Sequence, residues 1–432
     1  MPDQLVEFKT SAPVKAMMTL TVLLALFASW FVVRWYVGNT IAEYFHPEEH
    51  RLETAQMAVN LAPNDPLTHW RMGNLALKEL PPDQLPIVVA EYEKAVSLSP
   101  HDYRLWMEFG GALEQAGEFD KAEKALREAV KLAPSYAYPR WYLGNLLLRT
   151  DRYTEGFAEL QLASEQNAQF LPQLFNLAWQ LNKNDFNALR AAAGNSPPIR
   201  ADFSRYLVER GRYDDGLRLW DSLTETEKRE SRFAADPIIA SLISAQRYHT
   251  AMKIWNEVAP GPGYQAELGH ILDGGFEGNL AHGPGAVFGW QVQQNSQVQV
   301  GIDAGQGHSG SRSLRVYFQV RSHIDTINVS QLVPVKPNTE YDFECYSKTE
   351  RLESAETPVI AIANASDDAV LAVSSAAPSG SSNWQRIPLS FKTGEKTEAV
   401  KVKIVRNSCS DSPVCPIFGT VWYDDLNLKP RK

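Results

Sequence analysis

Hydrophobic and polar residues follow three different patterns along the chain. An uncharged, almost wholly apolar run covers residues 16–33, with the sequence AMMTLTVLLALFASWFVV. Residues 48–260 carry apolar side chains at helical spacing, whereas residues 269–432 alternate apolar and polar positions, as in SLRVYFQV. These spacings place the apolar side chains on one face of a helix or of a strand. We therefore predict a multidomain α plus all-β protein, with an apolar helix, a helical region and a C-terminal β region.

The apolar run is long enough to span a membrane, because its eighteen residues would rise about 27 Å as a helix. A buried core helix would be shorter or amphipathic. A cleaved signal peptide would have a shorter apolar region and a small-x-small cleavage site, whereas this run leads into RWY. We predict an uncleaved single transmembrane helix over 16–38, a preceding tail over 1–15 and a juxtamembrane segment over 39–47.

Charged residues near the run predict its orientation. Lys9 and Lys15 precede it, whereas Arg34 at its end is followed by Glu43 and Glu48. Basic residues favour the cytoplasmic side of a membrane. We therefore predict that the tail over 1–15 is cytoplasmic and that the C-terminal bulk is extracytoplasmic.

The net charge of −9 and the absence of a basic run argue against a nucleic-acid partner, since phosphate binding requires a basic surface. The three cysteines are Cys345, Cys409 and Cys415. A disulfide between Cys409 and Cys415 would close a short loop and fit an oxidising compartment, although two free thiols are equally compatible with this spacing. Cys345 alternates with aromatic residues and is predicted to lie in a core.

The helical region repeats at an interval of 34 residues. The residues that recur at this interval are Ala95, Ala129 and Ala163, Pro100 and Pro134, Gly110 and Gly144, and Phe119 and Tyr153. Small residues at fixed positions let two antiparallel helices approach closely, and the prolines end one pair before the next begins. The interval therefore predicts stacked helix pairs.

Two segments, WMEFGGALEQAGEFDKAEKALREAVKLAP and YPRWYLGNLLLRTDRYTEGFAELQLA, resemble the tetratricopeptide repeat. Weaker copies are GRYDDGLRLW and QRYHTAMKIW. The resemblance implies an α-solenoid over 48–260 that holds a protein partner on its concave face. The tryptophans predicted to pack between repeats are Trp70, Trp106, Trp141, Trp179, Trp220 and Trp255.

A breaker-rich segment over 261–268 is predicted to be a linker to a β-sandwich over 269–432 with nine or ten short antiparallel strands, most simply a jelly roll. The segments GGFEGN, GHSGSRSLRV, NWQRIPLSFKT and VWYDDLNL resemble, in this order, the galactose-binding-like jelly rolls that serve as carbohydrate-binding modules. The resemblance implies a structural calcium ion held by Glu277 with Asp424 or Asp425, since calcium prefers carboxylate oxygens. These carboxylates could instead be surface or turn residues without a metal.

Sugar binding requires aromatic faces and polar groups on one surface of the sandwich. The face opposite the apolar side of SLRVYFQV offers Tyr317, Gln319 and Arg321, and the neighbouring segment offers Tyr346. These four residues are the predicted glycan contacts, with a plain solvated face as the alternative. The tryptophans assigned to packing are Trp290, Trp384 and Trp422.

Motifs typical of catalysis are missing from the sequence, including Walker, HExxH and GxSxG motifs. We therefore predict a non-enzymatic scaffold that binds protein through its solenoid and polysaccharide through its β-sandwich. The domain combination suggests a bacterial inner (plasma) membrane and a role in envelope or exopolysaccharide assembly or export. The alternatives are a structural subunit of a larger membrane complex, whose sandwich makes protein contacts only, and a carbohydrate-acting enzyme.

Overall fold

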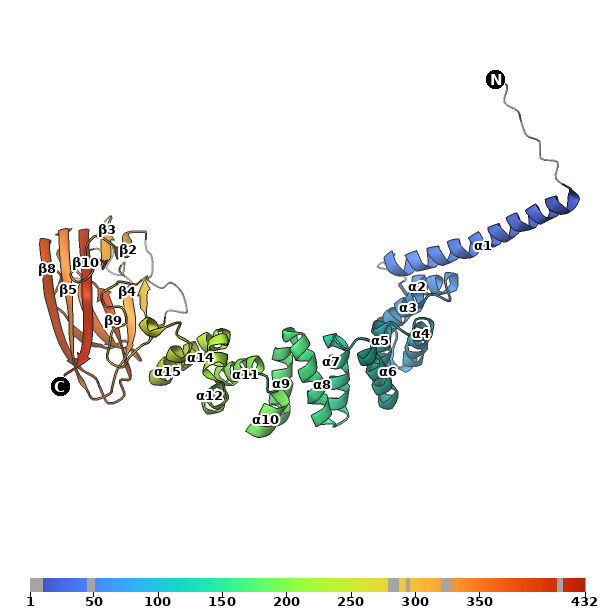
Figure 1. Cartoon of the computed structure of the whole chain (residues 1–432), viewed down its shortest axis with the longest axis horizontal. Coiled ribbons are helices and arrows are strands. Elements are labelled where there is room, and N and C mark those ends of the chain that lie inside the picture. Colours follow the sequence, from blue (N-terminus) through green and yellow to red (C-terminus); the bar gives the residue numbers. More distant parts are fainter. Residues whose placement is uncertain are drawn as a thin grey trace, which may run out of the picture. The chain divides into compact units, whose positions relative to one another are not determined.

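The computed structural model describes residues 11–44, 51–278, 287–292, 296–319, 327, 329–409 and 415–431. They form two compact units, Met1–Gly194 and Asn195–Lys432 (Figure 1). The division falls within the helical region that the sequence assigns to one solenoid, and the predicted domain boundaries stay predictions.

The first unit is helical throughout its described part. Its elements are α1 (Ala12–Tyr44), α2 (Arg51–Leu61), α3 (Pro66–Glu79), η1 (Pro82–Gln84), α4 (Leu85–Leu98), α5 (Tyr103–Gln115), α6 (Phe119–Leu132), α7 (Ala137–Arg149), α8 (Tyr153–Gln166), η2 (Ala168–Phe170), α9 (Leu171–Asn182) and α10 (Phe186–Ala193). The side chains of Asp65 and Asp102 begin α3 and α5 by accepting hydrogen bonds from the backbone N–H of Leu67 and Arg104. Such caps satisfy backbone donors that the first turn of a helix leaves unpaired.

Glycine allows the two helices of a pair to touch. A Cβ atom at Gly110 would lie 2.7 Å from Cγ of Leu126, and one at Gly144 would lie 2.7 Å from Cγ of Leu160. Side chains at these positions would therefore push α5 from α6 and α7 from α8. This contact explains why glycine recurs after 34 residues in the sequence and confirms the predicted helix pairs.

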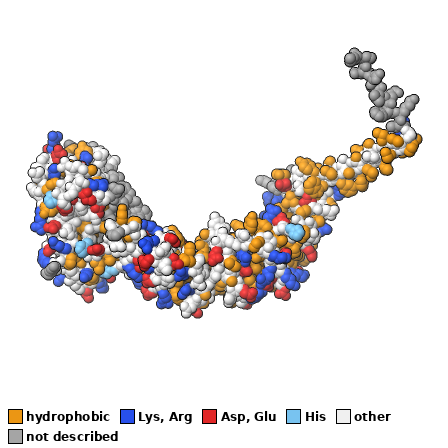
Figure 2. Space-filling model, viewed as in Figure 1, with side chains coloured by type: hydrophobic (Ala, Val, Ile, Leu, Met, Phe, Trp, Pro, Cys, Tyr) orange, Lys and Arg blue, Asp and Glu red, His pale blue; other side chains and the backbone are white. Residues whose placement is uncertain are grey.

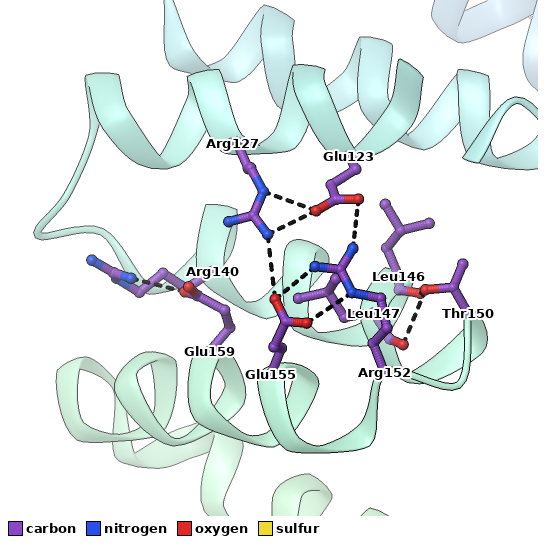
Figure 3. Close-up of polar contacts among 9 residues, drawn as sticks. All are labelled: Glu123, Arg127, Arg140, Leu146, Leu147, Thr150, Arg152, Glu155 and Glu159. Atoms are coloured by element: carbon purple, nitrogen blue, oxygen red, sulfur yellow. Dashed lines mark hydrogen bonds and ion pairs between the residues drawn. The ribbon is translucent and has the colours of Figure 1, made fainter. Parts of the chain in front are cut away.

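Ion pairs join the second helices of successive pairs (Figure 3). Arg152 contacts Glu123 of α6 at 2.7 Å and Glu155 of α8 at 2.6 Å. Arg127 of α6 pairs with Glu123 at 2.7 Å. Each exposed pair contributes only about 0–1 kcal/mol, so the buried apolar contacts provide most of the stability.

Most of α1 makes no packing contact with the described residues of the unit. An 18-residue window of this helix has a mean hydropathy of 2.2, and none of the window is buried. Figure 2 shows hydrophobic side chains along the helix. The C-terminal end of α1, in contrast, packs on the helices that follow. Gly38 lies so close to Ala62 that a Cβ at position 38 would be 2.8 Å from Cβ of Ala62. Asn39 donates a hydrogen bond of 3.0 Å to Asp65. The end of α1 is therefore fixed to the first helix pair.

The second unit begins with helices and ends with two sheets. The helices are α11 (Pro197–Glu209), α12 (Tyr213–Asp221), α13 (Glu225–Glu230), α14 (Arg232–Ser244), α15 (Tyr248–Val258) and η3 (Pro262–Tyr264). The strands are β1 (Trp290–Val292), β2 (Val298–Asp303), β3 (Ser313–Phe318), β4 (Val329–Pro334), β5 (Glu340–Glu353), β6 (Val359–Asn364), β7 (Val370–Val373), β8 (Gly380–Lys392), β9 (Ala399–Val405) and β10 (Phe418–Pro430).

The strands form an antiparallel β-sandwich, as predicted. One sheet has the order β1-β4-β9-β6-β7 and the other the order β2-β3-β10-β5-β8 (Figure 1). Alternate residues of β5, namely Tyr341, Phe343 and Cys345, are buried in the core between the sheets. Cys345 is therefore a core residue, as its alternation with aromatic residues predicts.

Residues of the β region enter the hydrophobic core of the last helices, which is separate from the core between the two sheets. The ring of Phe288, 1% exposed, meets the ring of Trp255 of α15 edge-on at 5.8 Å. The indole N–H of Trp255 donates to the carbonyl of Tyr264, and Asn256 exchanges two hydrogen bonds of 2.8 Å with the backbone of Ala266. The segment over 261–268 is thus held against α15 within the second unit.

We predict that Phe288→Ala destabilises the second unit by about 3–5 kcal/mol, because it removes a buried ring and leaves a cavity beside Trp255. Urea unfolding of the detergent-solubilised full chain, followed by circular dichroism, measures the loss. The matched control is Phe418→Ala, since the ring of Phe418 is 42% exposed, and it should change stability by about 0.5 kcal/mol or less. Equal losses in the two variants would contradict the burial of Phe288 in the core of the last helices.

Candidate functional site

The outer face of the β2-β3-β10-β5-β8 sheet carries two of the four predicted glycan contacts, Tyr317 and Tyr346. In the register of this sheet Tyr317 lies opposite Thr420 of β10, and Tyr346 lies opposite Asp424. The two tyrosines therefore lie on one face, separated by about 13 Å along β10. Gln319 is exposed just beyond β3. Arg321 lies outside the described residues.

Trp422 lies between these tyrosines on the same face. It pairs with Arg315 on one side and with Lys348 on the other, whereas the flanking Val421 and Tyr423 point into the core. Its indole N–H donates a hydrogen bond of 2.9 Å to Asp303, and the amine of Lys348 lies 5.8 Å from its ring. Trp422 is only 6% exposed, so it is packed, as predicted, but on the outer face of the sheet rather than in the core between the sheets.

A polar cleft of about 560 Å³ opens beside Trp422. Its lining includes Asp303, Gln306, Lys348, Glu350, Asn383 and Trp422. The amine of Lys348 donates a hydrogen bond of 2.6 Å to the side-chain oxygen of Gln306. The cleft thus combines one indole with amides, carboxylates and an amine, which are the groups that bind hydroxyls.

A second aromatic group lies on the same face. The ring of His308 stacks on Tyr346 with 3.7 Å between centroids and meets Trp384 edge-on at 5.8 Å. Trp384 is half-buried there, so the prediction that it packs in the core is wrong. The physical reason is its register, because it belongs to the outward row of β8 beside Arg386, the partner of Tyr346.

The predicted calcium residues hold the loop that carries His308. Glu277 accepts hydrogen bonds from the backbone N–H of Ser311 at 2.8 Å and of Arg312 at 3.0 Å. At the other end of the loop, Asp424 accepts from the N–H of His308 at 2.6 Å. A β-bulge at Asp424 places Asp425 at a φ of 51°, so that its carboxylate also faces His308, at 2.6 Å.

These carboxylates are satisfied by protein donors. Backbone hydrogen bonds from Ser311 and Arg312 lower the pKa of Glu277, whereas burial raises the pKa of Asp424. Both oxygens of Asp425 also have partners in the loop, His308 and the hydroxyl of Ser309. Within the described ranges no group of three His, Cys, Asp or Glu side chains is arranged to hold a metal. The arrangement fits a carboxylate-held loop without an ion, and the calcium ion stays a prediction.

The first unit has its own groove, of about 530 Å³, between α7 and α9. Its lining includes Tyr138, Trp141, Tyr142, Phe170, Asn176 and Gln180. Trp141 stacks on Phe170 at 4.4 Å between neighbouring helix pairs, as the predicted packing role requires. Tyr138 and Tyr142 are 53% and 42% exposed. The groove thus presents aromatic rings and side-chain amides.

Family models match both parts of the chain. The model described as carbohydrate binding domain matches residues 268–411, and the tetratricopeptide repeat model matches residues 89–137 and 110–172. The chain is a tetratricopeptide-repeat protein with a carbohydrate-binding domain. Neither of these domain types is catalytic. No curated protein matches the chain.

Solved structures similar to this tetratricopeptide-repeat protein include a MamA RS-1 ArsTM double mutant, at 22% identity and a TM-score of 0.25, covering 27% of this chain and 65% of that one. The CBM22-1-GH10 modules of Clostridium thermocellum xylanase 10B, complexed with xylohexaose, match at 15% identity and a TM-score of 0.27, covering 38% of this chain and 29% of that one. The protein YrrB, described as having an unusual peptide-binding site, matches at 17% identity and a TM-score of 0.25, covering 48% of this chain and 91% of that one. The chain therefore spans less than two thirds of the length of the MamA mutant and of the xylanase modules.

We predict that acid loosens the loop over 307–312 through Glu277. The pKa of Glu277 is lower in the folded protein than its ordinary value, so its ionised form stabilises the loop above pH of about 4.3. This stabilisation is lost as the pH falls through the folded pKa. Hydrogen exchange, corrected for intrinsic rates, should show lower protection of this loop in acid. Glu277→Gln should show the loss already at neutral pH.

The control variant is Glu395→Gln, which changes an exposed turn residue before β9 and should leave the exchange of the loop unchanged. A loop whose protection is the same in Glu277→Gln and in the unaltered protein would contradict the carboxylate contact. The same measurement with calcium and with a chelator tests the predicted ion. A calcium-dependent rise in protection would support it, and identical protection would contradict it.

Proposed function

We propose that this protein is a non-enzymatic, membrane-anchored scaffold that binds glycan through its sandwich and a protein partner through its repeats. The observation that carries the proposal is the position of Trp422 on the outer sheet face, beside a polar cleft of about 560 Å³. The carbohydrate-binding family match supports the same ligand class.

The chemistry of the cleft suits a sugar chain. The apolar face of a pyranose ring stacks on an aromatic side chain, while its hydroxyls need donors and acceptors at fixed positions. The stacked pair of Tyr346 and His308 supplies the aromatic surface, and the largely buried Trp422 forms part of the wall of the cleft. Asp303 and Glu350 supply acceptors, and Asn383 with the other amides supplies both donors and acceptors.

The groove between α7 and α9 is the proposed protein site. Its exposed tyrosines, Tyr138 and Tyr142, are rigid aromatic groups of the kind that contribute strongly to protein interfaces. Arg149, at the edge of the groove, is paired with Glu114 of α5. Because Arg149 is already paired, the groove is better suited to an extended peptide segment bound through aromatic and amide contacts than to a ligand carboxylate bound by a free basic side chain.

The anchor is the exposed apolar part of α1. Removing such a helix from water is favourable by roughly 25 cal/mol per Å² of apolar surface, and a bilayer provides the apolar surroundings. We propose that α1 crosses a bacterial inner membrane with the preceding tail in the cytoplasm, and that the two binding surfaces work in envelope polysaccharide assembly or export. The bare helix in the structure supports the anchor, and the domain combination supports the setting.

For glycan binding, we predict that Tyr346→Ala and Trp422→Ala each weaken the affinity for a bound oligosaccharide about fivefold or more, because each removes an aromatic group that contributes about 1 kcal/mol or more. A glycan array identifies the ligand, and calorimetry on the solubilised full chain measures its affinity. Near-ultraviolet circular dichroism checks that the variants fold. The control is Tyr264→Ala, whose ring is 58% exposed and lies in η3.

Binding to no glycan, together with stoichiometric copurification in a membrane complex, would contradict glycan binding and favour the structural-subunit alternative. Hydrolysis of the bound oligosaccharide would contradict the non-enzymatic part of the proposal.

For the protein site, we predict that a photoreactive amino acid at Tyr142 forms a discrete protein adduct in native membranes. The same probe at Lys124, which is exposed on α6 outside this groove, should give no such adduct. Immunoblotting after irradiation measures both. Adducts of equal yield from the two positions, or none from Tyr142, would contradict the proposed groove.

A further inference from the structure

A buried arginine lies against the disulfide that joins Cys409 and Cys415 at one end of the sandwich. Arg406 directly follows β9 and is only 5% exposed. Its Nη2 atom donates a hydrogen bond of 2.8 Å to the carbonyl of Cys415 and lies 3.1 Å from Sγ of the same residue. The guanidinium thus contacts the sulfur itself.

Among the described residues, the hydrogen-bond partners of this guanidinium are uncharged groups. Its other hydrogen bonds go to the hydroxyl of Ser354 at 3.1 Å and to the backbone carbonyl of Glu356 at 3.3 Å. Glu356 is a described acidic residue whose charge acts on Arg406, yet the hydrogen bonds from Arg406 end on the main-chain carbonyl of Glu356. Within the described part of the chain, Nη1 is buried and has no acceptor. A buried cation with neutral partners is costly, and an adjacent anion would stabilise it.

The two sulfurs differ in accessibility. Cys409, which follows β9, is half-buried, whereas Cys415 is completely buried. An external thiolate can therefore reach Cys409 first, and the sulfur released by its attack is the one beside Arg406.

We propose that Cys409 and Cys415 form a redox-active disulfide, in which Arg406 stabilises the Cys415 thiolate that reduction releases. The reductant is a dithiol, either a small molecule or a protein of the thioredoxin-like class. Its thiolate attacks Sγ of Cys409, forms a mixed disulfide and expels Cys415 as a thiolate paired with Arg406. The second thiol of the reductant then attacks the mixed disulfide, which leaves Cys409 as a thiol or thiolate and the reductant as a disulfide. Two electrons pass from the dithiol to the protein.

A stabilised leaving thiolate makes a disulfide easier to reduce, because it favours both the reduced state and the departure of that sulfur. The pair should therefore exchange readily with added dithiol, unlike a disulfide that only staples a fold. The inference is independent of the proposed glycan and protein sites.

The first experiment equilibrates the solubilised full chain in dithiothreitol redox buffers and quantifies the two thiols by alkylation and mass spectrometry. Arg406→Met removes the charge and should shift the equilibrium toward the disulfide about tenfold or more, whereas Arg406→Lys keeps the charge and should stay within about threefold of the unaltered protein. Equal shifts in both variants would indicate a structural role only and would overturn the proposal.

The second experiment leaves Arg406 in place, so that it does not depend on the folding of those variants. Cys409→Ser retains Cys415 beside the guanidinium, and Cys415→Ser retains Cys409 instead. Thiolate absorbance at about 240 nm should give a pKa at least one unit below the ordinary value of about 8.5 in Cys409→Ser but not in Cys415→Ser. Cys345 stays silent in both, since burial raises its pKa to about 12. The same pKa in both variants would overturn the proposal.

Discussion

The contact between Trp255 and Phe288 joins the helices of the second unit to its β region. Phe288 belongs to the β domain by sequence, yet its ring is buried among residues of α11–α15. The segment between them is held by the hydrogen bonds of Trp255 and Asn256, so the helices and the sandwich fold as one compact unit. The cleft beside Trp422 therefore lies on a unit that includes α11–α15. A ligand in that cleft acts on this whole unit rather than on a freely tethered module.

Much of the fold could be predicted because each element repeats a simple physical requirement. Gly110 and Gly144 recur because each helix pair needs one close approach, and Tyr341, Phe343 and Cys345 alternate because one face of β5 is buried. The division of the chain at Gly194 could not be predicted in this way. The division depends on which apolar side chains contact one another across long sequence distances. The sequence around a residue such as Phe288 does not indicate which distant residues it contacts.

The candidate site was partly predictable, because residues alternate between the two faces of a strand. Tyr317 and Tyr346 follow from the alternation of strands with a clear apolar face, and the structure brings both to one surface. The outward position of Trp422 was not predicted because its neighbours Val421 and Tyr423 are also large and apolar, so the segment does not reveal which of its faces points into the core. The roles of Glu277 and Asp424 required the structure, because their partners are backbone N–H groups of a loop.

The protein combines an exposed apolar helix, a groove in its repeats and a polar cleft on its sandwich. We propose that the helix holds the cleft at a membrane. Cosedimentation tests this claim most directly. Proteoliposomes that contain the full chain are mixed with the polysaccharide identified on the array and then pelleted. We predict that the polysaccharide pellets with the proteoliposomes and stays in solution with liposomes that carry the Trp422→Ala variant. Polysaccharide that remains in the supernatant with the unaltered chain, or protein that fails to enter the liposomes, would contradict the claim.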